Sequence, residues 1–254
     1  MKEQLKRLRL PRVRERFEEL ARLAAEEGWS HIEYLRRLIE EEIVAREENL
    51  IQRLRRQAKF PYEKTFEQFQ FRFRPELKKQ VFQTYLEESF VTAGRSLILI
   101  GPAGTGKTHL AVAIGMKMIG YGLSVRCVTV QSLVNQALRA SLEQRQKLLK
   151  PLLKCDLLIL DEFGYLPADA EVGPLLYELV AGRYEKKATI VTSNKSLKEW
   201  GRVLSDAALA GALLDRLLHH GDVYHLTGES YRLRGKMTAG QTDKSKSSKK
   251  TSKR

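Results

Sequence analysis

Eight consecutive residues in the middle of the chain match the G-x-x-x-x-G-K-[ST] pattern of a phosphate-binding loop. They follow the apolar run 97–100 and are Gly101, Pro102, Ala103, Gly104, Thr105, Gly106, Lys107 and Thr108. Glycines at this spacing let backbone N–H groups converge on a phosphate, and a helix that begins directly after them adds its positive end. The lysine would contact the β- and γ-phosphates, and the threonine hydroxyl would bind Mg²⁺. The sequence therefore predicts a site for a nucleoside triphosphate.

Two acidic residues, Asp161 and Glu162, end a second apolar run at 157–160. The first carboxylate is expected to hold Mg²⁺, and the second to orient and deprotonate a water molecule that attacks the γ-phosphate. The presence of both acids favours ATP hydrolysis over phosphoryl transfer to an organic acceptor. Asn194 follows a third such run, at the sheet edge where ligands of open α/β sheets collect, so its amide could polarise the attacking water. A turn-forming asparagine is the alternative interpretation.

The elements that must position these residues are short apolar or β-branched runs separated by helical segments. The runs cover residues 97–100, 125–130, 157–160, 189–192 and 223–226. This alternation predicts a parallel sheet with helices on both faces. The segment before residue 62 shows only helical periodicity, with Gly28 between two helices and with Ser30 and Glu33 as a capping box for the second. The apolar stripe predicted for that second helix consists of Leu35, Ile39, Ile43, Leu50 and Leu54.

The composition restricts the partners and the compartment. Lys and Arg number 45 against 31 acidic residues, and a net charge of +14 favours a polyanionic partner such as nucleic acid. No apolar run approaches the ~20 residues of a membrane span, and the charged N-terminus is unlike a secretory signal. Cys127 and Cys155 are predicted to be free thiols in buried strands, without the spacing of a metal site. His219 and His220 are interpreted as cations at a helix end and not as ligands.

Three basic segments are candidates for contact with nucleic acid. The first is the end of the second helix, around residues 53–59, and the second is the stretch 139–154 between two predicted strands. The third is the tail 236–254, which carries seven basic residues and one acidic residue and is expected to be disordered. A solvated charged surface is the alternative interpretation of each segment.

The order of the motifs resembles that of the AAA+ ATPases. Within that superfamily, the chain resembles the IstB-type insertion-sequence ATP-binding proteins and their DnaC helicase-loader relatives. Three segments carry this resemblance: Asp-Glu-Phe-Gly-Tyr-Leu-Pro at 161–167, the run 214–220, and Gly-Glu-Ser-Tyr-Arg-Leu-Arg at 228–234. The resemblance implies an AAA+ P-loop fold with a five-stranded parallel sheet in the order 5-1-4-3-2 and no C-terminal lid. It also implies a helical N-terminal domain at 1–61, an ATPase domain at 62–235 and the tail beyond them.

The resemblance further implies roles for single residues. The Asp–Glu pair would be the Walker B acids, Asn194 would be sensor 1, and Arg216 would be an arginine finger that acts on ATP bound to a neighbouring subunit. Arg232 or Arg234 would stand where a second sensor arginine contacts the nucleotide. Residues 65–69 are similar to the linker that lies near the adenine. From the spacing alone, Arg216 could instead be a surface ion-pair partner of Asp215 or of another neighbouring residue.

The function implied by the resemblance is that of an ATP-dependent helper of a transposase. Such a protein oligomerises on double-stranded DNA with ATP and Mg²⁺ at the subunit interfaces, and hydrolysis regulates its assembly and release. We expect it in the bacterial cytoplasm, associated with the nucleoid, and without a membrane partner. The alternative is a helicase loader of the DnaC type that binds single-stranded DNA. A small-molecule P-loop phosphotransferase is a more distant alternative.

Overall fold

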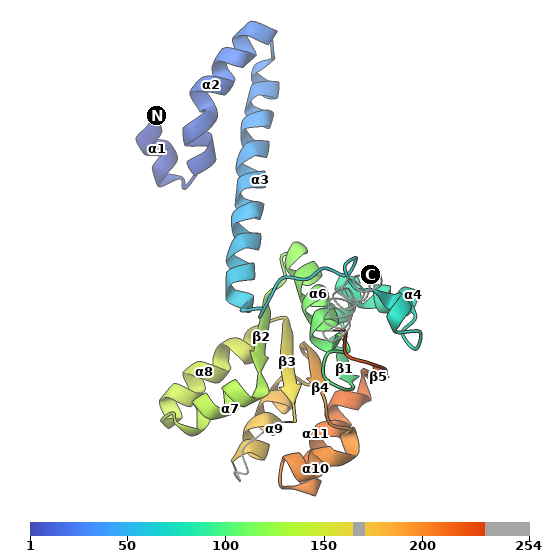
Figure 1. Ribbon diagram of the computed structural model, residues 1–254. Helices are drawn as coiled ribbons and strands as arrows, with labels where there is room; N and C mark the ends of the chain where they lie inside the picture. The colour runs from blue at the N-terminus through green and yellow to red at the C-terminus, as the bar shows by residue number, and fades with distance from the viewer. Residues whose placement is uncertain (165–170, 232–254) are drawn as a thin grey trace, which may run out of the picture. The chain divides into compact units, whose positions relative to one another are not determined.

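The computed structural model describes residues 1–164 and 171–231 (Figure 1). Two compact units divide the chain: the first is Met1–Arg56, and the second begins at Gln57. Residues 232–254 lie outside the described ranges. They include Arg232, Arg234 and the tail 236–254, and the predicted absence of a C-terminal lid also concerns this part of the chain. Within the two described ranges, no helix is long and apolar enough to cross a membrane.

The first unit consists of α1 (Lys2–Arg7), α2 (Pro11–Glu27) and most of α3 (His31–Ala58). Gly28 ends α2 with a φ of 67°, a left-handed conformation that a glycine adopts without strain. The hydroxyl of Ser30 accepts the N–H of Glu33 at 3.2 Å, as the predicted cap requires. A small apolar core joins α2 and α3 and contains Val13, Leu20 and Leu38.

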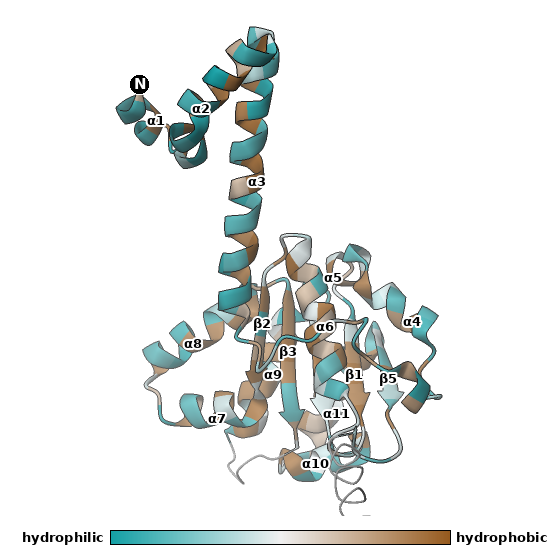
Figure 2. Cartoon of the chain, turned by 45° about the horizontal axis from the view of Figure 1, so that its top comes forward, coloured by the Kyte–Doolittle hydropathy of each residue, from teal (hydrophilic) through white to brown (hydrophobic). Residues whose placement is uncertain are grey.

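The apolar stripe predicted along α3 is mostly not buried. Leu54 is buried, but the exposed fractions of Leu35, Ile39 and Ile43 are 54%, 48% and 49%. Figure 2 shows hydrophobic bands along the surface of this helix. The reason is that α2 packs on a different face of α3, where the buried carboxylate of Glu42 accepts backbone N–H groups from the first turn of α2. The predicted apolar stripe is therefore largely exposed in this structure, apart from its end at Leu54.

The second unit is built on a five-stranded parallel sheet in the order β2-β3-β4-β1-β5. The strands are β1 (Ser96–Ile100), β2 (Val125–Thr129), β3 (Leu157–Phe163), β4 (Ala188–Ser193) and β5 (Gly221–His225). This order confirms the expected 5-1-4-3-2 arrangement. β2 is one residue shorter than predicted because Thr129 caps the next helix by accepting the N–H of Ser132.

Helices cover both faces of the sheet, as the alternating pattern predicts. The longer ones are α6 (Lys107–Gly120), α7 (Val130–Leu138), α8 (Leu142–Lys154), α9 (Val172–Arg183) and α11 (Ala207–His219). Short segments precede β1: η1 (Phe71–Phe73), α4 (Lys79–Gln83), η2 (Thr84–Leu86) and α5 (Glu88–Thr92). Two more, η3 (Leu197–Glu199) and α10 (Trp200–Val203), follow β4.

Successive residues of a strand point to opposite faces, so each central strand contributes to two apolar layers. Leu158 and Leu160 belong to a cluster with residues of α7, α9 and α11. Ile159 faces the other way, toward α6, where a Cβ added at Gly115 would lie 3.1 Å from its Cδ1. The sheet therefore lies between two layers of helices. Polar side chains can gather at the two edges of the sheet where its strands begin and end.

The two cysteines are free and buried, as expected. Cys127 lies in β2, and burial raises the pKa of its thiol to about 12. Cys155 is the C-terminal cap of α8 and lies two residues before the start of β3 at Leu157. The prediction that it lies within a strand is therefore wrong. Neither thiol is set up as a nucleophile, because burial disfavours the thiolate.

Candidate nucleotide site

The phosphate-loop motif lies between β1, which is buried along its whole length, and the first residue of α6. Gly101, Gly104 and Gly106 have φ values of 154°, 78° and 101°. A Cβ at Gly101 would lie 2.1 Å from the carbonyl oxygen of Leu226, and one at Gly106 would lie 2.6 Å from the ring of Phe69. Only glycine fits at these positions, because the neighbouring segments approach the loop backbone directly.

Lys107 is the first residue of α6, and its side chain is buried. Its Nζ donates hydrogen bonds of 2.7 Å to the carbonyl oxygens of Gly101 and Pro102. The ammonium group therefore lies within the loop and not in solvent. A positive charge beside the start of a helix and a glycine-rich backbone fits the anionic phosphates of a nucleoside triphosphate.

Thr108 and Asp161 are 53 residues apart in the sequence and are in contact in the fold. The hydroxyl of Thr108 donates to Oδ1 of Asp161 at 2.8 Å, and Asp161 is only 4% exposed. A hydroxyl oxygen and a carboxylate oxygen at this spacing are ligands that Mg²⁺ takes, together with phosphate oxygens and water. These two residues could hold the ion that accompanies a nucleotide in this loop.

Thr192, in β4, is a site residue that the sequence analysis did not identify. Its hydroxyl donates to Oδ1 of Asp161 at 2.5 Å and accepts the backbone N–H of Glu162 at 3.0 Å. One buried hydroxyl thus holds both acidic residues. The only signal in the sequence was a hydroxyl one position before the end of an apolar strand, which is common where no site exists.

Glu162 occupies an unusual backbone conformation. Its φ is 59°, and the pairing of β3 with β4 is irregular between Leu160 and Phe163. A residue other than glycine rarely has a positive φ, and such strain gathers at functional sites. The irregularity leaves Asp161 buried and Glu162 exposed at the same strand end, so one acid can bind an ion while the other meets a water molecule.

Asn194 lies directly after β4, at the same sheet edge as the acid pair. The hydroxyl of Ser193 donates to the carbonyl of Phe163 at 2.6 Å and ties the ends of β3 and β4 together. Within the described part of the chain, Oδ1 of Asn194 is buried and has no hydrogen-bond partner. A buried amide oxygen without a protein partner can accept a hydrogen bond from a bound water molecule.

A cavity of about 270 Å³ adjoins the phosphate loop. Its lining includes the aromatic side chains Tyr62, Phe69, Phe73 and Tyr231, together with Arg74 and His109. Arg74 is buried and donates to the carbonyls of Thr105 and Glu229, so it joins the loop to the segment that follows β5. An aromatic cavity beside a phosphate cradle can accept a purine base.

Sequence comparison identifies the family. The family model described as IstB-like ATP binding protein matches residues 3–239. The chain belongs to this family. A Geobacillus stearothermophilus relative named as an ATP-binding protein of insertion sequence IS5376 is 42% identical over 231 residues, which are 91% of this chain and 92% of the relative. A Pseudomonas aeruginosa relative, named likewise for IS21, is 38% identical over 237 residues, or 93% and 89% of the two chains.

Solved structures show the same fold for this IstB-like protein. DnaI matches with a TM-score of 0.51 and 21% identity, over 66% of this chain and 89% of DnaI. DnaA from Aquifex aeolicus, bound to AMPPCP, matches with a TM-score of 0.53 and 19% identity, over 73% of this chain and 57% of DnaA. Both the expected family and the expected AAA+ P-loop fold are confirmed. The molecule has the AAA+ P-loop fold and belongs to a family described as ATP-binding.

In this IstB-like protein, Arg216 does not lie at the phosphate loop. It is in the last turn of α11, which leads directly into β5. Gly221 at the start of β5 pairs with Ser96 at the start of β1, whereas the phosphate loop follows the end of β1. A five-residue strand separates the two edges by roughly 15 Å. The structure therefore places Arg216 at the sheet edge opposite its own nucleotide site.

The guanidinium of Arg216 is held by aromatic rings. It lies 4.7 Å from the ring centre of Tyr177 and 6.0 Å from that of Tyr184, and it donates to the carbonyl of Ala212 at 2.9 Å. Among the described residues, no ion pair with Asp215 is found, so that alternative has no structural support. A guanidinium held over aromatic faces keeps its donors and its charge available to another molecule.

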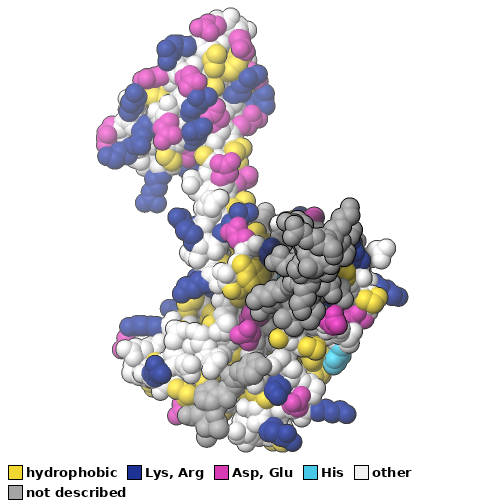
Figure 3. Space-filling model, in the orientation of Figure 1, with side chains coloured by type: hydrophobic (Ala, Val, Ile, Leu, Met, Phe, Trp, Pro, Cys, Tyr) yellow, Lys and Arg dark blue, Asp and Glu magenta, His cyan; other side chains and the backbone are white. Residues whose placement is uncertain are grey.

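The basic segments differ in how many of their Lys and Arg side chains pair with acidic side chains. Figure 3 shows basic and acidic side chains interspersed over the N-terminal helices. On α8, Lys147 pairs with Glu143 at 2.6 Å, and Arg145 pairs with Glu171. Exposed basic side chains at the end of that helix, such as Lys150, are not compensated in this way. Part of the basic charge of α8 is therefore paired with acidic side chains.

Proposed function

We propose that this IstB-like protein hydrolyses ATP at interfaces between its own subunits, and that the ATP-bound assembly binds duplex DNA as a helper of the transposase of its insertion sequence. The observation that carries the proposal is the position of Arg216. It is a preorganised cation at the edge opposite the phosphate loop, where it cannot reach its own nucleotide but can complete the site of a neighbour.

The residues at the phosphate loop support hydrolysis. Lys107 would bind the β- and γ-phosphates, and Thr108 with Asp161 would hold Mg²⁺, whose charge offsets that of the phosphate oxygens. Glu162 would accept a proton from the attacking water, which Asn194 would orient. Arg216 of a neighbouring subunit would stabilise the negative charge that develops on the transferred phosphoryl group. Arg232, the proposed second sensor, lies outside the described residues.

Binding to DNA is proposed from charge and from the relatives. The net charge of +14 favours a polyanion, and the two relatives above are named for insertion sequences. If ATP joins subunits, each subunit adds its own phosphate contacts, so a weakly basic surface becomes a strong and salt-dependent one. This arrangement would bind DNA with little sequence preference. The transposase encoded by the same element would be the protein partner.

Replacing Lys107 with alanine tests the link between ATP and DNA. We expect ATP affinity to fall by about 10²–10⁴-fold, because two charge-assisted hydrogen bonds to the phosphates, of roughly 1.5–3 kcal/mol each, would be lost. Binding to duplex DNA should then no longer respond to ATP, as measured by fluorescence anisotropy with labelled duplex and single-stranded DNA.

The matched control for this variant is Lys117→Ala, an exposed lysine on the same helix. It should leave both ATP affinity and DNA binding unchanged. Undiminished ATP-dependent duplex binding by Lys107→Ala would contradict the proposal. ATP-dependent binding of the unaltered protein to single-stranded DNA alone would instead favour a helicase loader.

Replacing Thr192 with valine tests how the acid pair is held. The change removes the hydroxyl that contacts Asp161 and Glu162 while keeping the shape of the side chain. We expect hydrolysis to fall about tenfold, since one to two hydrogen bonds of roughly 1 kcal/mol are lost, while ATP affinity stays within about threefold. Thr192→Ser, which restores the hydroxyl, should recover most of the rate. Equal losses in the valine and serine variants would show that the hydroxyl is not responsible.

A further inference from the structure

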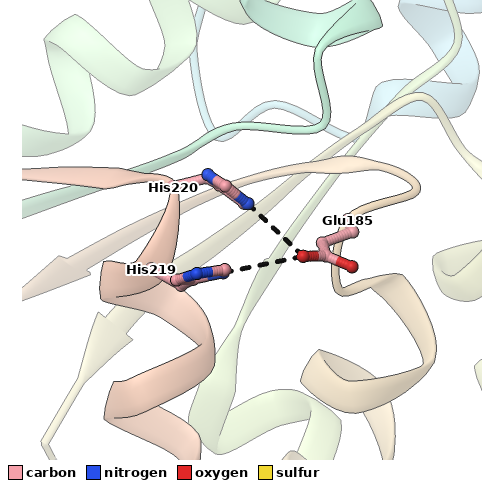
Figure 4. A group of neighbouring side chains, drawn as sticks. All are labelled: Glu185, His219 and His220. Atoms are coloured by element: carbon pink, nitrogen blue, oxygen red, sulfur yellow. Dashed lines mark hydrogen bonds and ion pairs between the residues drawn. The ribbon is translucent and has the colours of Figure 1, made fainter.

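Three ligand-type side chains meet at the edge of the sheet that carries Arg216. Glu185 follows α9, and His219 and His220 join α11 to β5 (Figure 4). Oε1 of Glu185 is 3.6 Å from Nδ1 of His219 and 3.3 Å from Nε2 of His220. One ligand atom from each of the three residues lies within 4.8 Å of the other two. Nothing in the phosphate site uses these residues.

These distances match the spacing of ligands around a shared ion. Bonds of about 2.0–2.1 Å at tetrahedral angles place two ligand atoms about 3.4 Å apart. The 3.3 Å pair is also a hydrogen bond, so the carboxylate of Glu185 already holds the imidazole of His220 close to it. The two carboxylate–imidazole distances of 3.6 and 3.3 Å are therefore close to the separation that two ligands of one ion require.

The backbone holds two of the three residues in place. The N–H of Ser96 donates to the carbonyl of His220 at 3.1 Å. A Cβ at Gly94 would lie 3.1 Å from the carbonyl carbon of Glu185, so the short stretch 94–96, which leads into β1, packs against both residues. Glu185 itself has a φ of 57°. Their proximity thus follows from the fold and not from the chance approach of long side chains.

The turn into β5 brings the histidines together. A Cβ at Gly221 would lie 2.0 Å from the carbonyl oxygen of Leu217, so only glycine lets the chain pass directly from α11 into the strand. The imidazole rings of His219 and His220 lie 4.1 Å apart, centre to centre. Consecutive residues can in this way present nitrogen atoms to one point.

The surroundings suit a cation. The three side chains border an open concavity of about 600 Å³, which also includes Arg95 and Asp222. Arg95 pairs with Asp222 at 2.6 Å, so its positive charge is compensated. The carboxylate of Glu185 then supplies the negative charge next to two imidazoles, and solvent can reach the cluster to provide further ligands.

We propose that Glu185, His219 and His220 bind a divalent transition-metal ion, with water completing the coordination. Two imidazoles and one carboxylate favour Zn²⁺, Cu²⁺ or Ni²⁺ over Mg²⁺ or Ca²⁺. The site is separate from the Mg²⁺ ligands proposed at Thr108 and Asp161. It differs from the interpretation of the two histidines as helix-end cations, which did not include Glu185.

The test is a Zn²⁺ titration of the full chain without an affinity tag, nucleotide or DNA, read against a chromogenic chelator. We expect one equivalent of Zn²⁺ to bind per chain. Glu185→Gln, His219→Asn and His220→Asn should each weaken binding by roughly tenfold or more, since even the partners of metal ligands contribute about 10–100-fold. His31→Asn and His225→Asn, which change exposed histidines elsewhere in the chain, are the controls and should bind Zn²⁺ as the unaltered chain does.

A second readout identifies the ligand atoms. The hydroxyl of Tyr184 is 2.6 Å from Nδ1 of His219, so it competes with a metal for that nitrogen. Tyr184→Phe is therefore expected to tighten Zn²⁺ binding by about 2–10-fold. The electron paramagnetic resonance spectrum of the Cu²⁺ form should show coupling to two imidazole nitrogens, lost stepwise in the histidine variants. Zn²⁺ binding that survives all three ligand variants, or that weakens equally in the controls, would overturn the proposal.

Discussion

Replacing Arg216 with alanine is expected to reduce steady-state ATP hydrolysis by roughly 10³–10⁵-fold, the contribution that an arginine finger makes to phosphoryl transfer. ATP binding by each subunit should persist, because Arg216 lies across the sheet from the phosphate loop of its own chain. Phosphate release and equilibrium binding of a fluorescent ATP analogue measure the two effects separately. Arg202→Ala, which removes an exposed arginine from α10, is the matched control and should retain the full rate.

Mixing this variant with Glu162→Gln shows whether the arginine acts on a neighbour. Each variant alone should be nearly inactive, for different reasons. In an equal mixture, about one quarter of the interfaces would combine an intact Glu162 with an intact Arg216 from the adjoining subunit, if subunits join at random in a head-to-tail arrangement. Hydrolysis should therefore return to about that fraction. A mixture as inactive as its components would remove the main support for the proposed interface.

Replacing Glu162 with glutamine is expected to lower hydrolysis by roughly 10²–10⁴-fold, the usual contribution of a general base. The amide has nearly the same shape but accepts no proton, and the residue is exposed, so the fold and ATP affinity should be unaffected. Because the ATP-bound state would persist, complexes with duplex DNA should become long-lived. Their dissociation after dilution, followed by fluorescence, measures this lifetime.

The control for the trapped state is Glu178→Gln, an exposed acid on α9. Complexes of this control should dissociate at the normal rate as ATP is consumed. If Glu162→Gln complexes dissociate as quickly, hydrolysis does not govern release, and the regulatory part of the proposal fails even if ATP binding and the interface stand.

Prediction from the sequence succeeded where the decisive residues are neighbours in the chain. The phosphate loop follows β1 and opens α6, as its glycines and lysine indicated. The cap at Ser30 and the break between helices at Gly28 were predicted for the same reason, because a helix end depends on a few adjacent residues. The exposure of much of the apolar stripe of α3 was not predictable, because periodicity shows that a helix has an apolar face but not which element covers it.

Thr192 illustrates a second limit. Nothing in its own segment distinguishes it from an ordinary strand threonine, and it becomes a site residue only because β4 pairs with β3 at the end where Asp161 and Glu162 lie. Strand pairing joins residues about 30 positions apart in this case. The register of that pairing therefore decides which hydroxyl meets the acids.

The sequence by itself determined that this chain binds a nucleotide phosphate and belongs among the AAA+ proteins, because short contiguous motifs have nearly the same geometry wherever they occur. Only the tertiary structure decided where the other charged groups lie. It placed Arg216 at the edge away from its own phosphate loop, and it brought Glu185 to His219 and His220. The physical reason is that parallel strands send all their carboxyl ends to one edge and all their amino ends to the other, a separation that no local pattern contains.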